Sequence, residues 1–78
     1  MLTLKIISAE QIEFEGQVQQ VTLPGVMGSF QVLRGHAALI AALAAGTLVW
    51  QGQDGEVSRQ IHGGVADIKD NVVSVCLY

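Results

Sequence analysis

The chain has little cysteine, little charge and no long apolar run, and each shortage argues against a class of protein. Its 78 residues include one cysteine, Cys76, so no internal disulfide can form, which fits a reducing compartment. The longest unbroken apolar run is the nine residues from Ala37 to Ala45, about half of what a transmembrane helix needs. The net charge is −3, which makes nucleic acid a poor electrostatic partner.

The balance between apolar and charged residues points to a protein partner. Hydrophobic residues make up 50% of the chain and charged residues 14%, whereas about 25% is usual in soluble domains. A single small domain spanning residues 1–78 has too much surface for its volume to hide half of its residues. We therefore expect part of its apolar surface to be covered by another protein. The alternative is a small domain that is merely sticky.

No arrangement of side chains in the sequence predicts catalysis, a metal site or a cofactor. His36 and His62 are 26 residues apart, and neither has a zinc-site spacing to Cys76. None of the serines lies in a Gly-x-Ser-x-Gly elbow. Residues 25–29 have spaced glycines but no lysine, so they do not form a phosphate-binding loop. Glu13 and Glu15 are interpreted as one solvated strand face rather than an acid/base pair.

Short segments of alternating apolar and polar residues recur along the chain, and turn signals separate them about every ten residues. The expected strands lie at residues 2–6, 12–15, 20–23, 30–32, 47–51, 57–62, 66–69 and 72–77. Pro24-Gly25, Asp54-Gly55, Gly63-Gly64 and Asp70-Asn71 supply turns between them. The pattern predicts an all-β fold, either a β-sandwich or a small barrel.

The alanine-rich segment from Ala37 to Ala45 does not fit this pattern. Alanine is the best helix former, and Gly46 could cap a short helix. A helix of nine residues is marginal, so pairing within a sheet could override the propensity. From the residues alone, a strand and a helical turn both stay open.

Residues 23–39 carry the most information about function. Gly25, Gly28 and Gly35 punctuate two apolar runs, and His36 follows the second run. The segment predicts a strand, a tight turn, a second strand and an exposed corner, with positive φ at Gly25 and Gly28. Met27 at the tip of the turn either serves a contact surface or folds back onto its own sheet. Trp50 is expected to pack in the core or in an interface.

This segment resembles the epsilon subunit of the F-type ATP synthase, which pairs a turn of the type LPG-x-x-G-x-F/L-G-I/V-L with a corner of the type P-x-HAPL. The resemblance covers nearly the whole chain, and the order and spacing of its pieces make it specific. The matching pieces are Leu4–Glu10, Phe14–Gly16, Val21–Gly25, Gly28–Phe30, Gly35–Ala37, Leu39, Ala42–Leu43, Gly46, Gly63–Val65 and Asp70–Val75.

The resemblance implies a β-sandwich of about ten short strands in two sheets, with a short strand within residues 37–45. It implies a non-catalytic subunit of the central rotor stalk, without a cofactor, that couples proton transport to ATP synthesis. One face would pack on the gamma subunit, and one end would meet the c-subunit ring. The subunit would lie on the cytoplasmic face of the bacterial plasma membrane, held there only through the complex.

The resemblance assigns the turn and the histidine corner to the ring-facing end. The residues expected to contact the c ring are Val26, Met27, Gly28, Ser29 and His36. The glycines expected to shape the turns are Gly25, Gly28, Gly35, Gly63 and Gly64.

The chain departs from the family in two places. Arg34 and Ala38 stand where the family has prolines around the histidine, which predicts a looser corner. The sequence ends at Tyr78, where the sandwich should be complete, and does not include the two-helix hairpin that usually follows it; a naturally short subunit and one domain of a longer chain both stay open. The alternative function is a free-standing β-barrel module for a small ligand or peptide, which would need an apolar pocket with convergent polar groups.

Overall fold

The computed structural model describes residues 1–78 and contains nine β-strands, which agrees with the roughly ten short strands that the resemblance implied. The strands are β1 (Leu2–Ile7), β2 (Ile12–Val18), β3 (Gln20–Gly25), β4 (Gly28–Leu33), β5 (Leu39–Leu43), β6 (Gly46–Gly52), β7 (Gly55–Ile61), β8 (Gly64–Lys69) and β9 (Val72–Leu77). The all-β prediction is confirmed. No helix here has the length and apolar character that crossing a bilayer would require.

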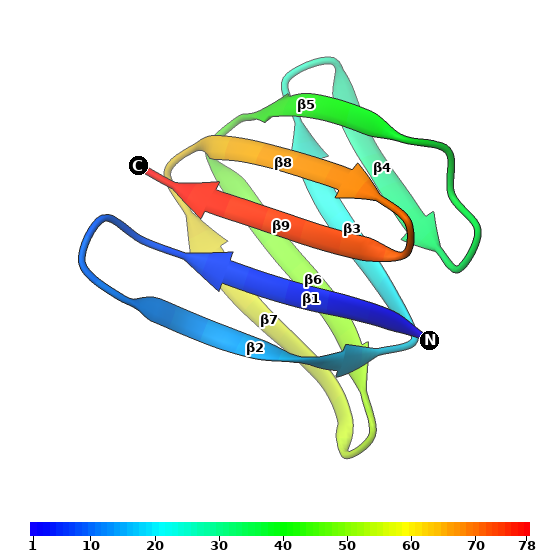
Figure 1. The fold of residues 1–78 in the computed structure, drawn as a ribbon. Helices are drawn as coiled ribbons and strands as arrows, with labels where there is room; N and C mark the ends of the chain where they lie inside the picture. Colours follow the sequence, from blue (N-terminus) through cyan, green and yellow to red (C-terminus); the bar gives the residue numbers. More distant parts are fainter.

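Hydrogen bonding joins all nine strands into one sheet, which curls into two packed layers (Figure 1). The first layer has the order β2-β1-β9-β8-β5, and the second contains β4, β3, β6 and β7. All strand pairs are antiparallel except β1 and β9, which run parallel. Strand β4 pairs only with β3, so its other edge is free.

The layers meet where the chain passes from β5 to β6. Gly25 of β3 pairs with Leu43 of β5, and Thr22 of β3 pairs with Val49 of β6. Strands β5 and β6 therefore pair with β3 one after the other along its length, although they belong to different layers. At the bend, Ala44 N–H donates to the Pro24 carbonyl at 2.8 Å.

The alanine-rich segment forms strand β5 rather than a helical turn. All five of its residues pair with β8, from Leu39 opposite Ile68 to Leu43 opposite Gly64. These backbone partners come from a segment distant in sequence, and they outweigh the local helix propensity. The strand implied by the resemblance is confirmed.

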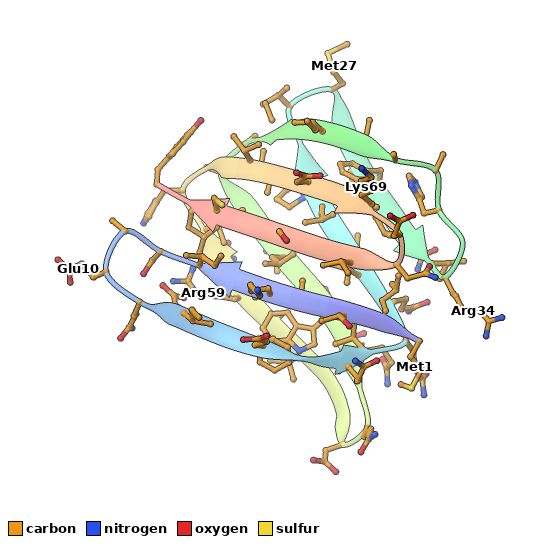
Figure 2. The ribbon with its side chains drawn as sticks, in the orientation of Figure 1. Met1, Glu10, Met27, Arg34, Arg59 and Lys69 are labelled. Atoms are coloured by element: carbon orange, nitrogen blue, oxygen red, sulfur yellow. The ribbon has the colours of Figure 1, made fainter.

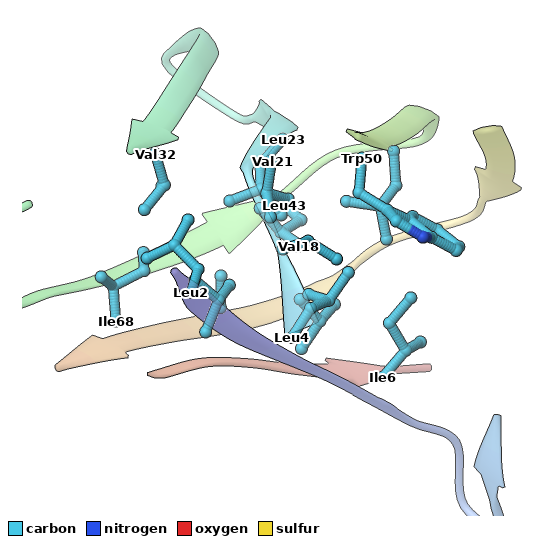
Figure 3. Packing of buried hydrophobic residues seen from close by; sticks show 14 of the residues in the cluster. Leu2, Leu4, Ile6, Val18, Val21, Leu23, Val32, Leu43, Trp50 and Ile68 are labelled. Carbon is cyan, nitrogen blue, oxygen red and sulfur yellow. The ribbon is translucent and has the colours of Figure 1, made fainter. Parts of the chain in front are cut away.

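The core lies between the layers and consists of 15 buried apolar side chains. Figure 3 shows Leu2, Leu4 and Ile6 of β1 pointing across the sandwich toward strands of the second layer. Trp50 is only 6% exposed, and its ring centroid lies 4.9 Å from that of Phe14. Of its two predicted roles, packing in the core is confirmed.

The turn glycines divide into two kinds. Gly28, Gly35 and Gly63 have positive φ angles of 124°, 85° and 146°, as expected of turn residues. Gly25 ends strand β3 without positive φ, so that prediction is wrong. A Cβ at Gly25 would lie 2.8 Å from the Gly28 carbonyl oxygen, so close packing requires glycine there.

Gly64 also differs from the prediction, because it begins strand β8 rather than lying in a turn. A Cβ there would overlap the carbonyl oxygen of Cys76 on β9. Here, too, the glycine permits a close approach between backbones and is not needed for its φ angle.

The predicted turn at Asp70-Asn71 is confirmed as a two-residue hairpin loop between Lys69 and Val72. Both residues have positive φ, 52° and 64°, which is the type I′ geometry that suits the twist of a hairpin. The predicted hairpin at Asp54-Gly55 is confirmed as well, with Gly52 paired to Gly55.

A bulge in β2 corrects the interpretation of Glu13 and Glu15 as one strand face. The register of the β1–β2 pair shifts between Ile6 and Ile7. Ile6 pairs with Phe14 and Ile7 with Ile12, which leaves Glu13 as the extra residue. Glu13 then reaches Arg59 of β7 in the other layer, with an N···O distance of 2.6 Å. Glu15 instead lies 4.0 Å from Lys5 on the neighbouring strand of its own layer.

Candidate protein-binding surfaces

The polar side chains form no cluster of catalytic or metal-binding type. No group of three or more histidine, cysteine, aspartate or glutamate residues comes together, and no polar or charged residue is buried. His36 is half-buried, and its Nδ1 lies 2.7 Å from the carbonyl oxygen of Ala37. What the fold offers instead is the outer surface of each layer.

The tip of the β3–β4 hairpin projects from the molecule. Met27 is 97% exposed, so of the two predicted placements the folded-back one is excluded (Figure 2). Val26 and Ser29 are also exposed. The tip is held against β5, because Val26 N–H donates to the Ala42 carbonyl at 3.0 Å.

The histidine corner, residues 34–38, lies at the opposite end of β4 from this tip. Figure 2 shows Met27 and Arg34 well separated. The six residues of β4 between them span roughly 20 Å at the usual rise per residue. The five residues predicted to face one partner are thus distributed along β4 rather than gathered at a single end.

The corner is tied to both layers. His36 N–H donates to the Leu33 carbonyl at 3.1 Å, which closes a tight turn at the end of β4. Gly35 N–H donates to the side-chain Oδ1 of Asn71 at 2.7 Å. Asn71 belongs to the β8–β9 turn of the first layer. The bond therefore links the corner, which follows β4 of the second layer, to the first layer.

A shallow apolar depression of about 320 Å³ lies between the hairpin tip and β5. Its lining combines glycines with apolar side chains, among them Met27, Phe30 and Ile40. No polar side chain converges on it, so the depression offers nothing to orient a small ligand by hydrogen bonds.

The outer face of the first layer carries a row of apolar side chains that crosses all five strands. Neighbours in the row pair directly: Ala42 with Val65, Val65 with Cys76, Cys76 with Ile7, and Ile7 with Ile12. We call these five residues the apolar ladder. Ile40, which is 72% exposed, lies beside it on β5.

The outer face of the second layer has a different chemistry. Its outward positions alternate with buried residues such as Val21, Leu48 and Trp50, and most are uncharged polar side chains. They are Gln20, Thr22, Ser29, Gln31, Leu33, Thr47, Val49, Gln51, Glu56, Ser58 and Gln60. Glu56 is the one ionisable side chain in this set.

Sequence reasoning anticipated an apolar contact face and did not locate the ladder. The sequence does contain a sign of it: several strands have an apolar residue near one end on the face that is otherwise polar, such as Ile7 in β1 and Cys76 in β9. The ladder becomes visible only when the register places these residues next to one another.

Comparison with known proteins gives consistent matches over nearly the whole chain. Residues 1–77 match the family described as ATP synthase, Delta/Epsilon chain, beta-sandwich domain. The ATP synthase epsilon chain of Rhodopseudomonas palustris (strain BisB18) is 37% identical over 70 residues, covering 90% of this chain and 52% of the relative. The epsilon chain of Chlorobaculum tepidum is 40% identical over 70 residues, covering 88% of this chain and 80% of the relative.

Solved structures show the same fold. A chain in the Euglena gracilis mitochondrial ATP synthase, in an assembly of OSCP, F1 and c-ring, superposes with a TM-score of 0.90 at 25% identity. The match covers 97% of this chain and 49% of that one. A chain of the Tetrahymena thermophila central stalk and c-ring shares the fold at 14% identity and a TM-score of 0.79. The chain spans about half the length of the first curated relatives it matches.

Proposed function

This chain belongs to the ATP synthase delta/epsilon chain β-sandwich family, and we propose that it acts as a non-catalytic subunit of the central rotor stalk. In this role it links the gamma subunit to the c ring and helps to couple proton transport to ATP synthesis. It then lies on the cytoplasmic face of the bacterial plasma membrane and is held there through the complex. The relatives named as epsilon chains support this role.

The apolar ladder is the observation that carries the proposal, and we assign it to the gamma subunit. Five apolar side chains in one cross-strand row form a continuous stripe rather than scattered exposed residues. Ile40, which lies beside the ladder on β5 and is 72% exposed, extends the apolar area. A stable interface buries about 800 Å² on each partner, and we expect the contact with gamma to be of at least this size.

The edge of β4 is the proposed contact with the c ring. Val26, Met27, Gly28 and Ser29 lie at one end of this strand, and His36 lies just beyond the other. Because β4 pairs only with β3, its free edge and both of its ends are accessible to a partner. Ser29 and His36 offer hydrogen bonds to polar loops, and Met27 offers adaptable packing.

Co-elution tests the gamma contact. The chain and the gamma subunit, mixed at micromolar concentration, should leave a size-exclusion column as one species. Separate elution of the two proteins would rule out a tight complex and would favour a free-standing module.

Cysteine crosslinking tests the ring contact within the assembled synthase. In a Cys76→Ala background, Ser29→Cys and His36→Cys should each form a disulfide with a cysteine placed in the c-subunit loop. Ser58→Cys, on β7 of the second layer's outer face, is the matched control and should not react. If neither Ser29→Cys nor His36→Cys reacts, the assignment of the β4 edge to the ring is wrong.

A further inference from the structure

Asn71 joins three segments that are distant in sequence. Its main-chain carbonyl accepts a hydrogen bond from Thr3 N–H at 2.9 Å, at the start of β1. Its side-chain Oδ1 accepts a second hydrogen bond from Gly35 N–H at 2.7 Å, in the histidine corner. One residue of the β8–β9 turn therefore fixes both the beginning of the chain and the corner that carries His36.

The conformation of Asn71 explains how its side chain reaches the corner. Asn71 has φ 64°, a left-handed conformation that asparagine tolerates better than most residues. Its main-chain carbonyl is already committed to β1, so the side-chain amide is the group left to bond outward. The Asn71 Oδ1 accepts from the Gly35 N–H, which lies outside the strands and has no partner in the sheet.

The corner has few other constraints. Gly35 has φ 85°, and no atom lies within 4 Å of the position its Cβ would take. Arg34 and Ala38 stand on either side of the Gly35-His36 pair, so no proline stiffens the corner. Apart from the Leu33–His36 turn bond and the contact between His36 and Ala37, the Asn71 bond is the hydrogen bond that ties this corner to the rest of the fold.

We propose that Asn71 is a positioning residue for the ring contact: it holds the corner through Gly35 N–H and so sets where His36 is presented. This inference rests on the proposed function of the β4 edge. Asn71 acts through Gly35 and contacts no part of the ring itself. Its role is to make the corner a fixed point on the rotor rather than a loop that yields under torque.

Three variants separate this role from general stability. Asn71→Gly keeps the left-handed backbone and removes the acceptor. Asn71→Asp restores an acceptor oxygen at the same position. Asp70→Gly is the matched control, because Asp70 lies in the same turn with φ 52° and makes no bond to Gly35.

The first measurement is amide hydrogen exchange of Gly35 in the 78-residue chain. A hydrogen bond of ordinary net strength slows exchange of its donor about fivefold. Asn71→Gly should therefore speed exchange at Gly35 about fivefold, Asn71→Asp should restore the wild-type rate, and Asp70→Gly should leave it unchanged. Unchanged exchange in Asn71→Gly would show that Asn71 does not hold the corner.

The second measurement is the initial rate of the His36→Cys crosslink to the c-subunit loop in the assembled synthase. Asn71→Gly should slow it about twofold or more, and Asn71→Asp should bring it back. If exchange at Gly35 speeds up and the crosslink rate does not change, Asn71 holds the corner without positioning it for the ring, and the proposal is wrong. If His36→Cys fails to crosslink even with Asn71 intact, the ring assignment itself is wrong, while Gly35 exchange still reports on the Asn71 bond.

Discussion

The two outer faces of this sandwich are built by the same alternation of residues, yet they differ in chemistry. On the first layer, the apolar ladder crosses five strands without a polar interruption. On the second layer, the row of Gln31, Thr22, Val49 and Ser58 crosses four strands and is mostly polar. A face of the second kind can remain in water, whereas a continuous apolar stripe gains free energy when a partner covers it.

Few charges do not by themselves imply that the whole surface is covered. Glutamine, threonine and serine keep the second face polar while adding no charge. The first layer's outer face carries Lys5, Glu15, Asp67 and Lys69 beside the ladder, so the ladder, rather than that whole face, is the part that calls for a partner.

The largest effect should come from a glycine substitution at a position where the neighbouring backbone leaves no room for a Cβ. In Gly64→Ala, the new Cβ would overlap the Cys76 carbonyl within the first layer, so β8 and β9 must shift. We expect a loss of about 2–4 kcal/mol in the free energy of unfolding. Urea denaturation followed by tryptophan fluorescence measures this loss.

Gly52→Ala is the control in the second layer, where the new Cβ would lie 3.7 Å from the Gly55 carbonyl oxygen, an ordinary contact distance. Its free energy of unfolding should change by less than about 1 kcal/mol. Equal losses in the two variants would show that overlap with the Cys76 carbonyl is not the cause of the loss at Gly64.

The next largest effect should come from placing a charge on the outer face of each layer. Val65→Lys puts an ammonium group in the middle of the apolar ladder, next to Ala42 and Cys76. If the ladder binds gamma, affinity should fall by about 2 kcal/mol or more, roughly 30-fold, because the charge must be desolvated in the interface. Titration calorimetry of the chain against gamma measures the change.

The control for this variant is Thr47→Lys, an exposed position on the outer face of the second layer. Its affinity for gamma should match that of the wild type, and both variants should keep the wild-type melting temperature. A larger loss for Thr47→Lys than for Val65→Lys would reverse the assignment of the two faces.

Removing the ion pair between the layers should have the smallest effect. Arg59 and Glu13 join the edge strands of the two layers at 2.6 Å, whereas Lys5 and Glu15 lie 4.0 Å apart on one face. Arg59→Ala should cost about 0.5–1 kcal/mol of stability, and Lys5→Ala close to zero. Thermal unfolding at low and high salt checks both values, and a larger cost for Lys5→Ala would contradict this ranking.

Local patterns in the sequence were sufficient for the fold class and several turns. Alternation predicted short strands, and Asp54-Gly55 and Asp70-Asn71 predicted hairpins that the structure contains. These features depend on residues close together in the chain, where backbone preferences act directly. The resemblance in residues 23–39 added the family, which the comparisons confirm.

Long-range pairing decided the rest. Residues 39–43 became a strand because β8 offers them backbone partners, and a bulge turned Glu13 away from Glu15 toward Arg59. The same is true of the candidate site. Each ladder residue is an ordinary outward position on its own strand, and only the register of five strands makes a continuous surface of them. Alternation tells which face of a strand a side chain occupies, but its neighbours across the sheet depend on pairings between distant segments, and these are set by the packing of the whole core.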